Sequence, residues 1–271
     1  MVLYLVGLGL SNEKDLTLRG LELIEKADKL YLESYTSILS PGANIIKILK
    51  GKELIEADRK TIEEDCDSII SEAKEKNVVL LVVGDPFCAT THSDLVLRSY
   101  EKGVDIEVVH NASIISAIGC TGLQVYRFGE TVSIPFFEDN WKPTSFYDKI
   151  KSNLERGLHT LCLLDIKVKE QTIENMMKNK PIFEPPRFMT VNQAISQILS
   201  VGEKDKSSLL SQDSLGFGVA RIGSEDQMVV SGTLKELIHI EFGGPLHSLV
   251  VCHPDLHLIE KRFFEINRRA L

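Results

Sequence analysis

The chain has 271 residues, of which 43% are hydrophobic and 26% are charged. This length suits one large domain or two medium ones with a buried core, and the charged fraction is that of a globular protein rather than a disordered one. Lys and Arg total 31 and Asp and Glu total 39, so the formal net charge is −8. An acidic chain is not a nucleic-acid binder over its whole surface, although it could carry a local basic patch.

The cysteines do not indicate a disulfide-bonded secreted protein. Their number is odd, they are widely spaced and none forms a C-x-x-C pair, which excludes a fully paired framework and the usual zinc-ribbon spacing. The N-terminus lacks the basic segment of a signal peptide, and no run approaches the ~20 apolar residues of a membrane span. We therefore expect a cytoplasmic protein without a membrane segment or a metal site, with free thiols at Cys66, Cys88, Cys120, Cys162 and Cys252.

The first 73 residues alternate between strand-like and helix-like patterns. An apolar run predicts a strand at 2–6, and the helical spacing of Leu18, Leu21 and Ile24 predicts a helix that Thr17 would cap. A second strand is expected at 30–32. Thr61-x-x-Glu64 is typical of a capping box, and a helix with one apolar face follows it, formed by Ile62, Cys66, Ile69 and Ala73.

The next segment continues the alternation. The run 78–83 is apolar at every position, as a central parallel strand requires. A helix at 94–102, stopped by Gly103, and a strand at 105–109 follow. Because strand and helix alternate so regularly, we predict a doubly wound, mainly parallel sheet for the first 110 residues.

The second half has a different rhythm. Residues 111–124 are rich in Ala, Ser, Gly and Ile and suggest a tightly packed helix, and Thr190-x-x-Gln193 is typical of a capping box. Further strands are expected at 128–137, 159–164, 216–222, 227–230 and 246–252, and further helices at about 146–156, 190–199 and 256–268. A boundary near residue 112 fits best, so we predict two α/β domains, 1–112 and 113–271.

A glycine pair follows the first predicted strand. Gly7-x-Gly9 stands between a strand and a helix, but the third glycine of a dinucleotide fingerprint would fall at Asn12, and the P-loop lysine signature is absent. The two glycines could serve only a tight turn, or they could let a ligand approach the backbone. The spacing favours neither reading.

Gly84-Asp85-Pro86 follows the most buried of the predicted strands. Ligands of open α/β sheets bind outside the carboxyl ends of the strands, so this position favours a functional role for Asp85. The competing interpretation is an Asx-turn or cap aspartate. His92 alone would more often be a cap or surface histidine, and His247 follows a glycine-containing loop that permits close approach of a ligand.

Acid–base machinery is sparse elsewhere. No local motif pairs a Ser or Cys nucleophile with a base, and no carboxylate pair or metal spacing is present. Such a sequence suits a reaction in which a cofactor carries the chemistry.

Seven segments, taken in their order along the chain, carry a family resemblance. They closely resemble the diphthine synthase family, within the tetrapyrrole methylase-like superfamily, and the resemblance spans nearly the whole chain. Gly84-Asp85-Pro86 alone indicates only the superfamily, whereas the blocks at 89–95 and 110–114 narrow the resemblance to this family. The blocks are 5–10 and 32–37, 83–87, 89–95 (Ala-Thr-Thr-His-Ser-Asp-Leu), 110–114 (His-Asn-Ala-Ser-Ile), 160–167 and 245–248.

The resemblance implies an S-adenosylmethionine-dependent methyltransferase of diphthamide biosynthesis, with two α/β domains and the donor in a cleft between them. It also implies a homodimer and a protein substrate, elongation factor 2, whose histidine bears a 3-amino-3-carboxypropyl group. Some members add three methyl groups to the amine, and others add a fourth to the carboxylate. Residues 111–137 look more like the second group, so we expect four methylations, giving diphthine methyl ester and S-adenosylhomocysteine.

Cofactor contacts carried over from the resemblance fall at eight positions. Cys88 departs from the Gly or Val of relatives, so we expect only its backbone to contribute. The aliphatic members would form an apolar sleeve for adenine and ribose, although each would otherwise be ordinary core. The positions are Leu10, Asp85, Cys88, Ser113, Ile114, Leu164, Ile222 and His247.

A methylsulfonium is already a strong electrophile, so the protein mainly has to align donor and acceptor. We therefore expect no indispensable catalytic side chain, and His247 is the best candidate if a base exists. Three alternatives remain open at this point: a related methyltransferase acting on a tetrapyrrole or other small metabolite, a non-catalytic adaptor on the same fold, and a nicotinamide oxidoreductase, which the incomplete glycine fingerprint disfavours.

Overall fold

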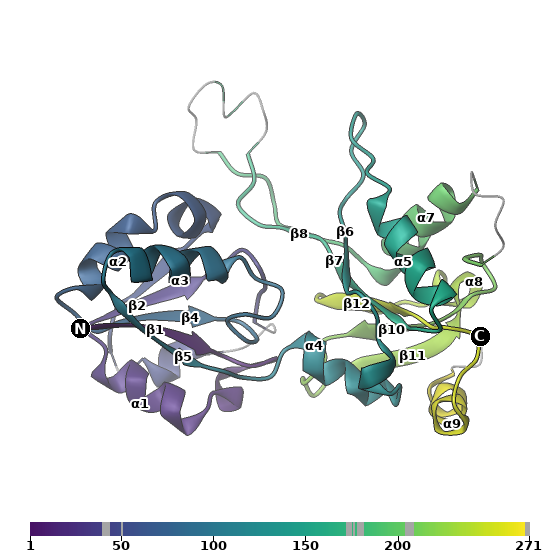
Figure 1. Ribbon diagram of the computed structural model, residues 1–271, viewed down its shortest axis with the longest axis horizontal. Coiled ribbons are helices and arrows are strands. Elements are labelled where there is room, and N and C mark those ends of the chain that lie inside the picture. Colours follow the sequence, from purple (N-terminus) through teal and green to yellow (C-terminus); the bar gives the residue numbers. More distant parts are fainter. Residues whose placement is uncertain are drawn as a thin grey trace. The chain divides into compact units, whose positions relative to one another are not determined.

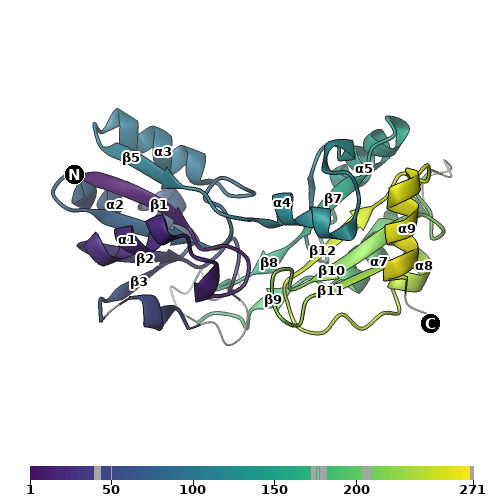
Figure 2. The ribbon, with the colours of Figure 1, turned by 90° about the horizontal axis from the view of Figure 1, so that it is seen from below.

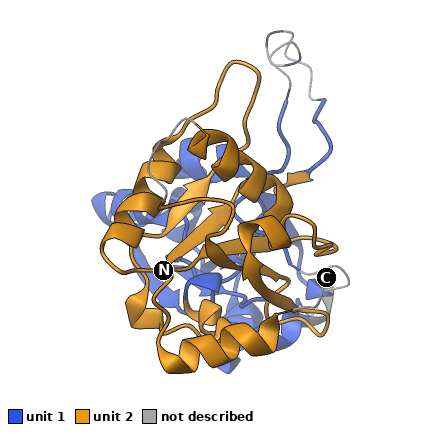
Figure 3. Ribbon diagram, turned by 90° about the vertical axis from the view of Figure 1, so that its right-hand side faces the viewer, with its two compact units in different colours: residues 1–115, 167–186 blue, residues 116–166, 187–271 orange. Residues whose placement is uncertain are grey.

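The computed structural model describes residues 1–39, 44–49, 51–171, 175, 177, 182–203 and 209–268. Contacts within the chain divide it into two compact units, coloured separately in Figure 3. Unit 1 comprises residues 1–115 and 167–186, and unit 2 comprises residues 116–166 and 187–271. The division into two α/β domains, 1–112 and 113–271, stays a prediction. The compact units place the first boundary after Ile115 and add residues 167–186 to unit 1.

Unit 1 contains a five-stranded parallel sheet with the strand order β3-β2-β4-β1-β5. The central strand β4 is buried at all five positions, in agreement with its uninterrupted Val and Leu run. The predicted parallel sheet is therefore confirmed for this unit. Its strands are β1 (Val2–Gly7), β2 (Lys29–Glu33), β3 (Leu54–Ala57), β4 (Val78–Val82) and β5 (Asp105–Val109).

Helices cover both faces of this sheet (Figure 1). On one face, α1 packs Ile24 against Val6, Leu30 and other strand residues. On the other face, α2 and α3 pack Ile69 and Leu95 against Leu5 and its neighbours. The helices of unit 1 are α1 (Leu18–Lys26), α2 (Asp67–Ala73) and α3 (His92–Glu101), with short turns at η1 (Glu13–Asp15), η2 (Ile45–Ile48) and η3 (Lys60–Glu64).

The two predicted caps of unit 1 have different outcomes. The hydroxyl of Thr17 accepts a hydrogen bond of 3.0 Å from the N–H of Gly20, which confirms the first cap. The capping box at Thr61 is wrong, because the carboxylate of Asp58 accepts the N–H of Thr61 at 2.9 Å and the turn begins earlier. An aspartate is itself a strong capping acceptor, so Asp58 competes successfully with Thr61 for this role.

Unit 2 contains a second five-stranded sheet, with the order β11-β10-β12-β7-β6. Only β6 and β7 pair in parallel, and the other neighbours are antiparallel. The all-parallel pairing is thus confined to the unit 1 sheet. The strands are β6 (Val132–Ile134), β7 (Thr160–Leu164), β10 (Leu215–Ala220), β11 (Met228–Thr233) and β12 (His247–Val251), and a separate two-stranded sheet joins β8 (Ile166–Lys167) and β9 (Arg187–Phe188).

Helices again cover both faces of the unit 2 sheet. Helices α5, α7 and α8 pack on one face (Figure 1), and α9, seen from its own side in Figure 2, packs on the other, where Phe264 meets Phe217 at 5.4 Å between ring centroids. Thr190 and Gln193 form the predicted capping box at the start of α7. These helices are α5 (Ser145–Glu155), α7 (Val191–Gly202), α8 (Leu234–Leu237) and α9 (Leu258–Asn267).

The predicted helix over 111–124 is wrong. Only α4 (Ile114–Ala117) is α-helical, and 3₁₀ turns follow at η4 (Ile118–Thr121) and η5 (Val125–Arg127). Gly122 lies in the left-handed region at φ 79°, and a Cβ there would stand 2.0 Å from the ring of Phe263. Packing against α9 therefore requires a glycine that ends the helical turn. Among the described residues, no helix has both the length and the apolar character needed to cross a membrane.

Candidate functional site

The carboxyl ends of β4, β1 and β5 adjoin at one edge of the unit 1 sheet. The chain passes from β1 to β2 on one side and from β4 to β5 on the other, so β1 and β4 flank the topological switch point. Ligands of open α/β sheets bind at this position. Three loops meet there, formed by residues 7–12, 84–91 and 110–113.

The glycines of the first two loops hold backbone against backbone. The N–H of Gly9 donates to Gly84 O at 3.2 Å, and the N–H of Gly84 donates to Gly9 O at 2.8 Å. A Cβ on Gly7 would lie 2.6 Å from Gly84 O, and one on Gly9, at φ 81°, would lie 2.6 Å from the Cβ of Asp15. Close approach of the chain to itself accounts for both glycines, so the structural reading of Gly7-x-Gly9 is sufficient.

Asn111 ties the third loop to the first. Its side-chain amide donates to Gly7 O at 2.9 Å and to Asp15 O at 3.0 Å. In the sequence, Asn111 stands out only as part of the 110–114 block of the resemblance, and no separate role is expected for it, because an asparagine after a strand is common in turns. The role is visible only once β1 and β5 lie side by side.

Asp85 is buried and joins the second and third loops. Its Oδ1 accepts the N–H of Phe87 at 2.9 Å, and its Oδ2 accepts the N–H of Asn111 at 3.1 Å. Oδ2 also lies 2.8 Å from Nδ1 of His110. Burial raises the pKa of Asp85, but these three hydrogen bonds together lower it by more than burial raises it. The pKa of Asp85 therefore lies below its usual range, and the carboxylate is ionised. The bond to Phe87 makes the predicted Asx turn.

His110 and His92 occupy opposite environments at this edge. The side chain of His110 is 68% exposed, whereas His92 is fully buried. His92 Nδ1 lies 2.9 Å from Pro86 O, so this ring supports the 84–91 loop from inside. The interpretation of His92 as a surface histidine is therefore wrong, and the sequence points to His110 only as part of the 110–114 block of the resemblance, with no role of its own.

Five of the eight predicted contact residues lie in unit 1, on these loops or directly after one of them. Leu10 directly follows Gly9. Cys88 closes a turn, and its backbone N–H donates to Asp85 O at 3.2 Å. A Cβ added to Gly84 would lie 3.6 Å from the Cβ of Ser113, so Ser113 adjoins the Asp85 loop. Ile114 is the first residue of α4. The unit 1 set thus gathers at the sheet edge.

The other three predicted residues gather in unit 2, at one end of β10, β12 and β7. His247 begins β12 and pairs with Ala220, two residues before Ile222. Ser248 pairs with Leu163, which places Leu164 next to the same end. The antiparallel order brings together residues that are 25 and 83 positions from His247 along the chain.

His247 carries a buried nitrogen with an open lone pair. Its Nε2 lies 2.9 Å from Gly244 O, and because a carbonyl only accepts, Nε2 holds the proton. Its Nδ1 is then an acceptor, and it is buried without a hydrogen-bond partner among the residues that the structure describes. Burial lowers the pKa of His247, which the bond to Gly244 only partly offsets, so the ring is neutral at pH 7.

Arg221 holds the two loops that carry Ile222 and His247. Its guanidinium donates to Phe242 O at 2.7 Å, to Gly244 O at 2.6 Å and to Oδ2 of Asp226 at 2.6 Å. Its own backbone is left-handed, at φ 50°. Nothing in the sequence indicated this role, since the partners are mostly backbone carbonyls of a distant loop.

Comparisons with known proteins identify the family of this chain. Residues 2–238 match the model of the tetrapyrrole (corrin/porphyrin) methylases. The chain belongs to the tetrapyrrole methylase family. A Dictyostelium discoideum relative named diphthine methyl ester synthase is 52% identical over 99% of this chain and 98% of its own length, and a Homo sapiens relative of the same name is 47% identical over 98% and 94%. A crystal structure of diphthine synthase superposes with a TM-score of 0.82 at 34% identity, covering 99% of this chain and 96% of that one.

Family membership makes the chain a methyltransferase and confirms the predicted fold class. The predicted adaptor and oxidoreductase readings lose their support, because the relatives that span the whole chain are named as methyl ester synthases. The branch with a methyl ester product is also the one that the sequence favoured.

The residues present fit a methyl donor of the S-adenosylmethionine type. None of the four predicted aliphatic contacts is fully buried, whereas the residues of the sheet cores are. Partly exposed aliphatic surface beside backbone polar groups, present in each unit, suits an adenine ring, and Nδ1 of His247, which has no partner among the described residues, could accept an N–H from a ligand. The four are Leu10, Ile114, Leu164 and Ile222.

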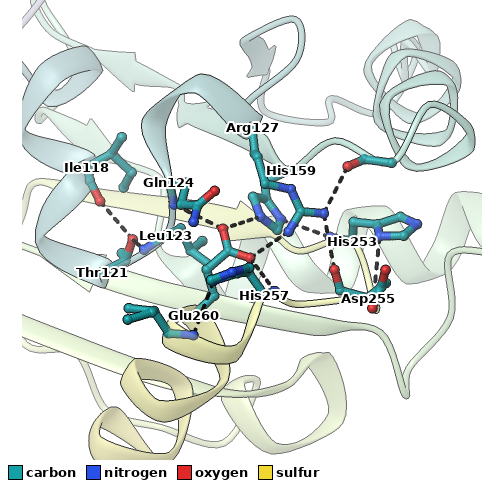
Figure 4. A network of polar contacts seen from close by, with 12 residues as sticks. Ile118, Thr121, Leu123, Gln124, Arg127, His159, His253, Asp255, His257 and Glu260 are labelled. Carbon is teal, nitrogen blue, oxygen red and sulfur yellow. Dashed lines mark hydrogen bonds and ion pairs between the residues drawn. The ribbon is translucent and has the colours of Figure 1, made fainter.

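A second cluster of titratable groups lies in unit 2, around the fully buried carboxylate of Glu260 (Figure 4). It accepts from Arg127 at 2.6 Å and from Nε2 of His159 at 3.2 Å, and the N–H groups of Gln124 and His257 complete its bonds. Burial raises the pKa of Glu260, but these donors lower it below its ordinary value. Every member is satisfied internally, so this cluster attaches α9 rather than binding a ligand.

Proposed function

We propose that this chain is a diphthine methyl ester synthase. It transfers methyl groups from S-adenosylmethionine to the 3-amino-3-carboxypropyl-histidine of elongation factor 2. Three methyl groups go to the amine and a fourth to the carboxylate, which gives diphthine methyl ester and four molecules of S-adenosylhomocysteine. The observation that carries this proposal is the identity of about half of all residues, over nearly full length, with relatives of that name.

The donor supplies an electrophilic methyl group, and the protein supplies its position. In the proposal, Leu10, Ile114, Leu164 and Ile222 provide apolar surface for the nucleoside. His247 accepts a hydrogen bond through Nδ1, which is buried and has no hydrogen-bond partner among the described residues. Ser113 and Cys88 border the Asp85 loop. Holding donor and acceptor in line can contribute about 7–11 kcal/mol to catalysis without any covalent step on the protein.

Asp85 contributes to this site mainly by fixing the loops. Its two oxygens already accept three hydrogen bonds, so the proposed effect on the donor passes through the backbone of residues 84–88 and 110–114. Asp85→Ala is expected to weaken donor binding, and calorimetry that gives an unchanged Kd would remove Asp85 from the site.

The test of the function is the mass of the product. The protein is incubated with S-adenosylmethionine and elongation factor 2 that carries the 3-amino-3-carboxypropyl group, and the modified peptide is weighed. Four added methylenes on the histidine are expected. Three added methylenes would retain the substrate but reject the ester step. No added methylene on the histidine, together with methylation of a tetrapyrrole or another small metabolite, would overturn the proposal in favour of a small-molecule methyltransferase.

The proposal also includes a homodimer in the cytoplasm. Light scattering of the purified protein tests the homodimer, and a molecular mass of one chain at micromolar concentration would reject it. Imaging of the tagged protein in its own cell tests the cytoplasmic location. All five cysteines are free thiols, as a reducing compartment permits.

A further inference from the structure

We propose that His110, oriented by Asp85, is the general base that removes a proton from the acceptor amine before each N-methylation. This rests on the proposed function, because it concerns the amine of that substrate. It replaces the expectation that no side-chain base is needed and assigns the role to a residue other than His247.

The pair fixes which nitrogen of His110 is available. Nδ1 lies 2.8 Å from Oδ2 of Asp85, and the ionised carboxylate can only accept, so Nδ1 carries the proton. The neutral ring therefore presents Nε2 as a free lone pair. The arrangement matches that of other enzymes, in which a buried carboxylate holds a catalytic imidazole in one tautomer.

Exposure differs between the two members of this pair. The side chain of Asp85 is 6% exposed and that of His110 is 68% exposed. An exposed imidazole can receive a proton from a bound amine and then release it to water, so it is ready for the next methylation. Phe87 borders the ring at 6.1 Å between centroids and gives it an apolar neighbour on the same loop as Asp85.

Other histidines are less suited to this step. His159 uses both nitrogens, donating to Glu260 and accepting the N–H of His253 at 3.0 Å. His92 is fully buried beneath the loop, and the open nitrogen of His247 is buried as well. His110 combines a carboxylate partner, an open nitrogen and access to solvent at the sheet edge.

Each methylation of the amine begins with a proton transfer. The ammonium nitrogen gives one proton to Nε2 of His110 and regains its lone pair. That pair forms the bond to the methyl carbon while the carbon–sulfur bond breaks, and sulfur keeps the bonding electrons as the neutral thioether. His110 then releases its proton to water. Each of the three amine methylations needs one such transfer, whereas the carboxylate methylation needs none, because the carboxylate is already ionised.

This asymmetry provides the test. His110→Asn keeps a side-chain N–H for Asp85 but has no base. We expect it to slow the three amine methylations about 100-fold, the low end of what a positioned base contributes. Ester formation on elongation factor 2 that already carries the trimethylated group, and the Kd for S-adenosylmethionine by calorimetry, should both stay within about 2-fold. The matched control is His239→Asn, at an exposed histidine of unit 2, which should change nothing.

A second variant separates the base from the shape of the ring. His110→Ala should regain amine methylation when imidazole is added, and imidazole should not affect the wild type. Amine methylation by His110→Asn at the wild-type rate would overturn the proposal, as would equal slowing of the amine and ester steps. Absence of any mass change with the wild-type protein would instead reject the proposed function itself.

Discussion

Each unit contains a buried carboxylate that is paired with a histidine, and the two pairs differ in what remains free. In unit 2, Glu260 and His159 are both fully buried, and both ring nitrogens of His159 are engaged. In unit 1, Asp85 is buried but His110 is exposed and has one nitrogen open.

The difference separates a structural pair from one that could do chemistry. The His159 ring accepts a backbone N–H at Nδ1, which requires an unprotonated nitrogen there, and burial lowers its pKa more than Glu260 raises it. It cannot exchange protons without breaking the cluster. His110 can change its protonation state while Asp85 keeps its backbone bonds to Phe87 and Asn111.

The largest expected effect tests the structural side of this comparison. Glu260→Ala should lower the free energy of unfolding by about 3–5 kcal/mol, because it leaves Arg127 and two backbone N–H groups without their acceptor. Urea denaturation measures it. The control is Lys149→Ala, which breaks an exposed pair with Glu130 and should cost about 1 kcal/mol or less. A loss for Glu260→Ala as small as that of the control would contradict a structural role.

Next in size is a change to the loops that carry the Asp85–His110 pair. Gly7→Ala should destabilise the protein by about 1–3 kcal/mol, because its Cβ would meet Gly84 O and the Cβ of Asn111 at 2.6 and 2.8 Å. Thermal unfolding gives the loss. Gly244→Ala is the matched control, since its Cβ would meet open space. Equal stability of the two variants would show that the loops adapt without cost.

A smaller effect distinguishes the two histidines by pH. Burial lowers the pKa of His159, so below the ordinary histidine value of about 6.5 the unfolded chain binds a proton that the folded chain does not. The free energy of unfolding should therefore decrease as the pH falls below this value, by up to about 1.4 kcal/mol per pH unit from this residue.

Denaturation at a series of pH values measures this slope. In His159→Gln, which keeps a donor for Glu260, the slope should be shallower than in the wild type. In His110→Asn, which leaves the contact between His159 and Glu260 intact, the slope should equal that of the wild type. The same slope in His159→Gln as in the wild type would remove His159 as its source.

The smallest effect concerns the donor. His247→Ala removes the open buried acceptor, and the Kd for S-adenosylmethionine should rise about 5–10-fold, the equivalent of about 1 kcal/mol for one hydrogen bond. Calorimetry gives the value, and S-adenosylhomocysteine should lose the same factor. If catalysis were abolished while the Kd stayed constant, His247 rather than His110 would be the base.

Local patterns in the sequence were sufficient for most of unit 1 and for the start of α7 in unit 2. A run that is apolar on both faces predicts a central strand, and hydroxyl caps such as Thr17 and Thr190 act within one turn, so both are readable without tertiary structure. The position of Asp85 at the end of β4 follows from the same reasoning. The resemblance of its motifs supplied the family and the eight contact positions, which remain proposals.

Tertiary structure decided what depends on distant partners. Gly122 ends a helical turn because of Phe263, Arg221 binds carbonyls about 20 residues away, and Asn111 reaches back to Gly7. The clearest case is His110. A histidine after a strand has no function that spacing can reveal. Its role depends on a parallel sheet that brings β5 within one strand of β4, so that one oxygen of Asp85 orients the ring and leaves its other nitrogen open.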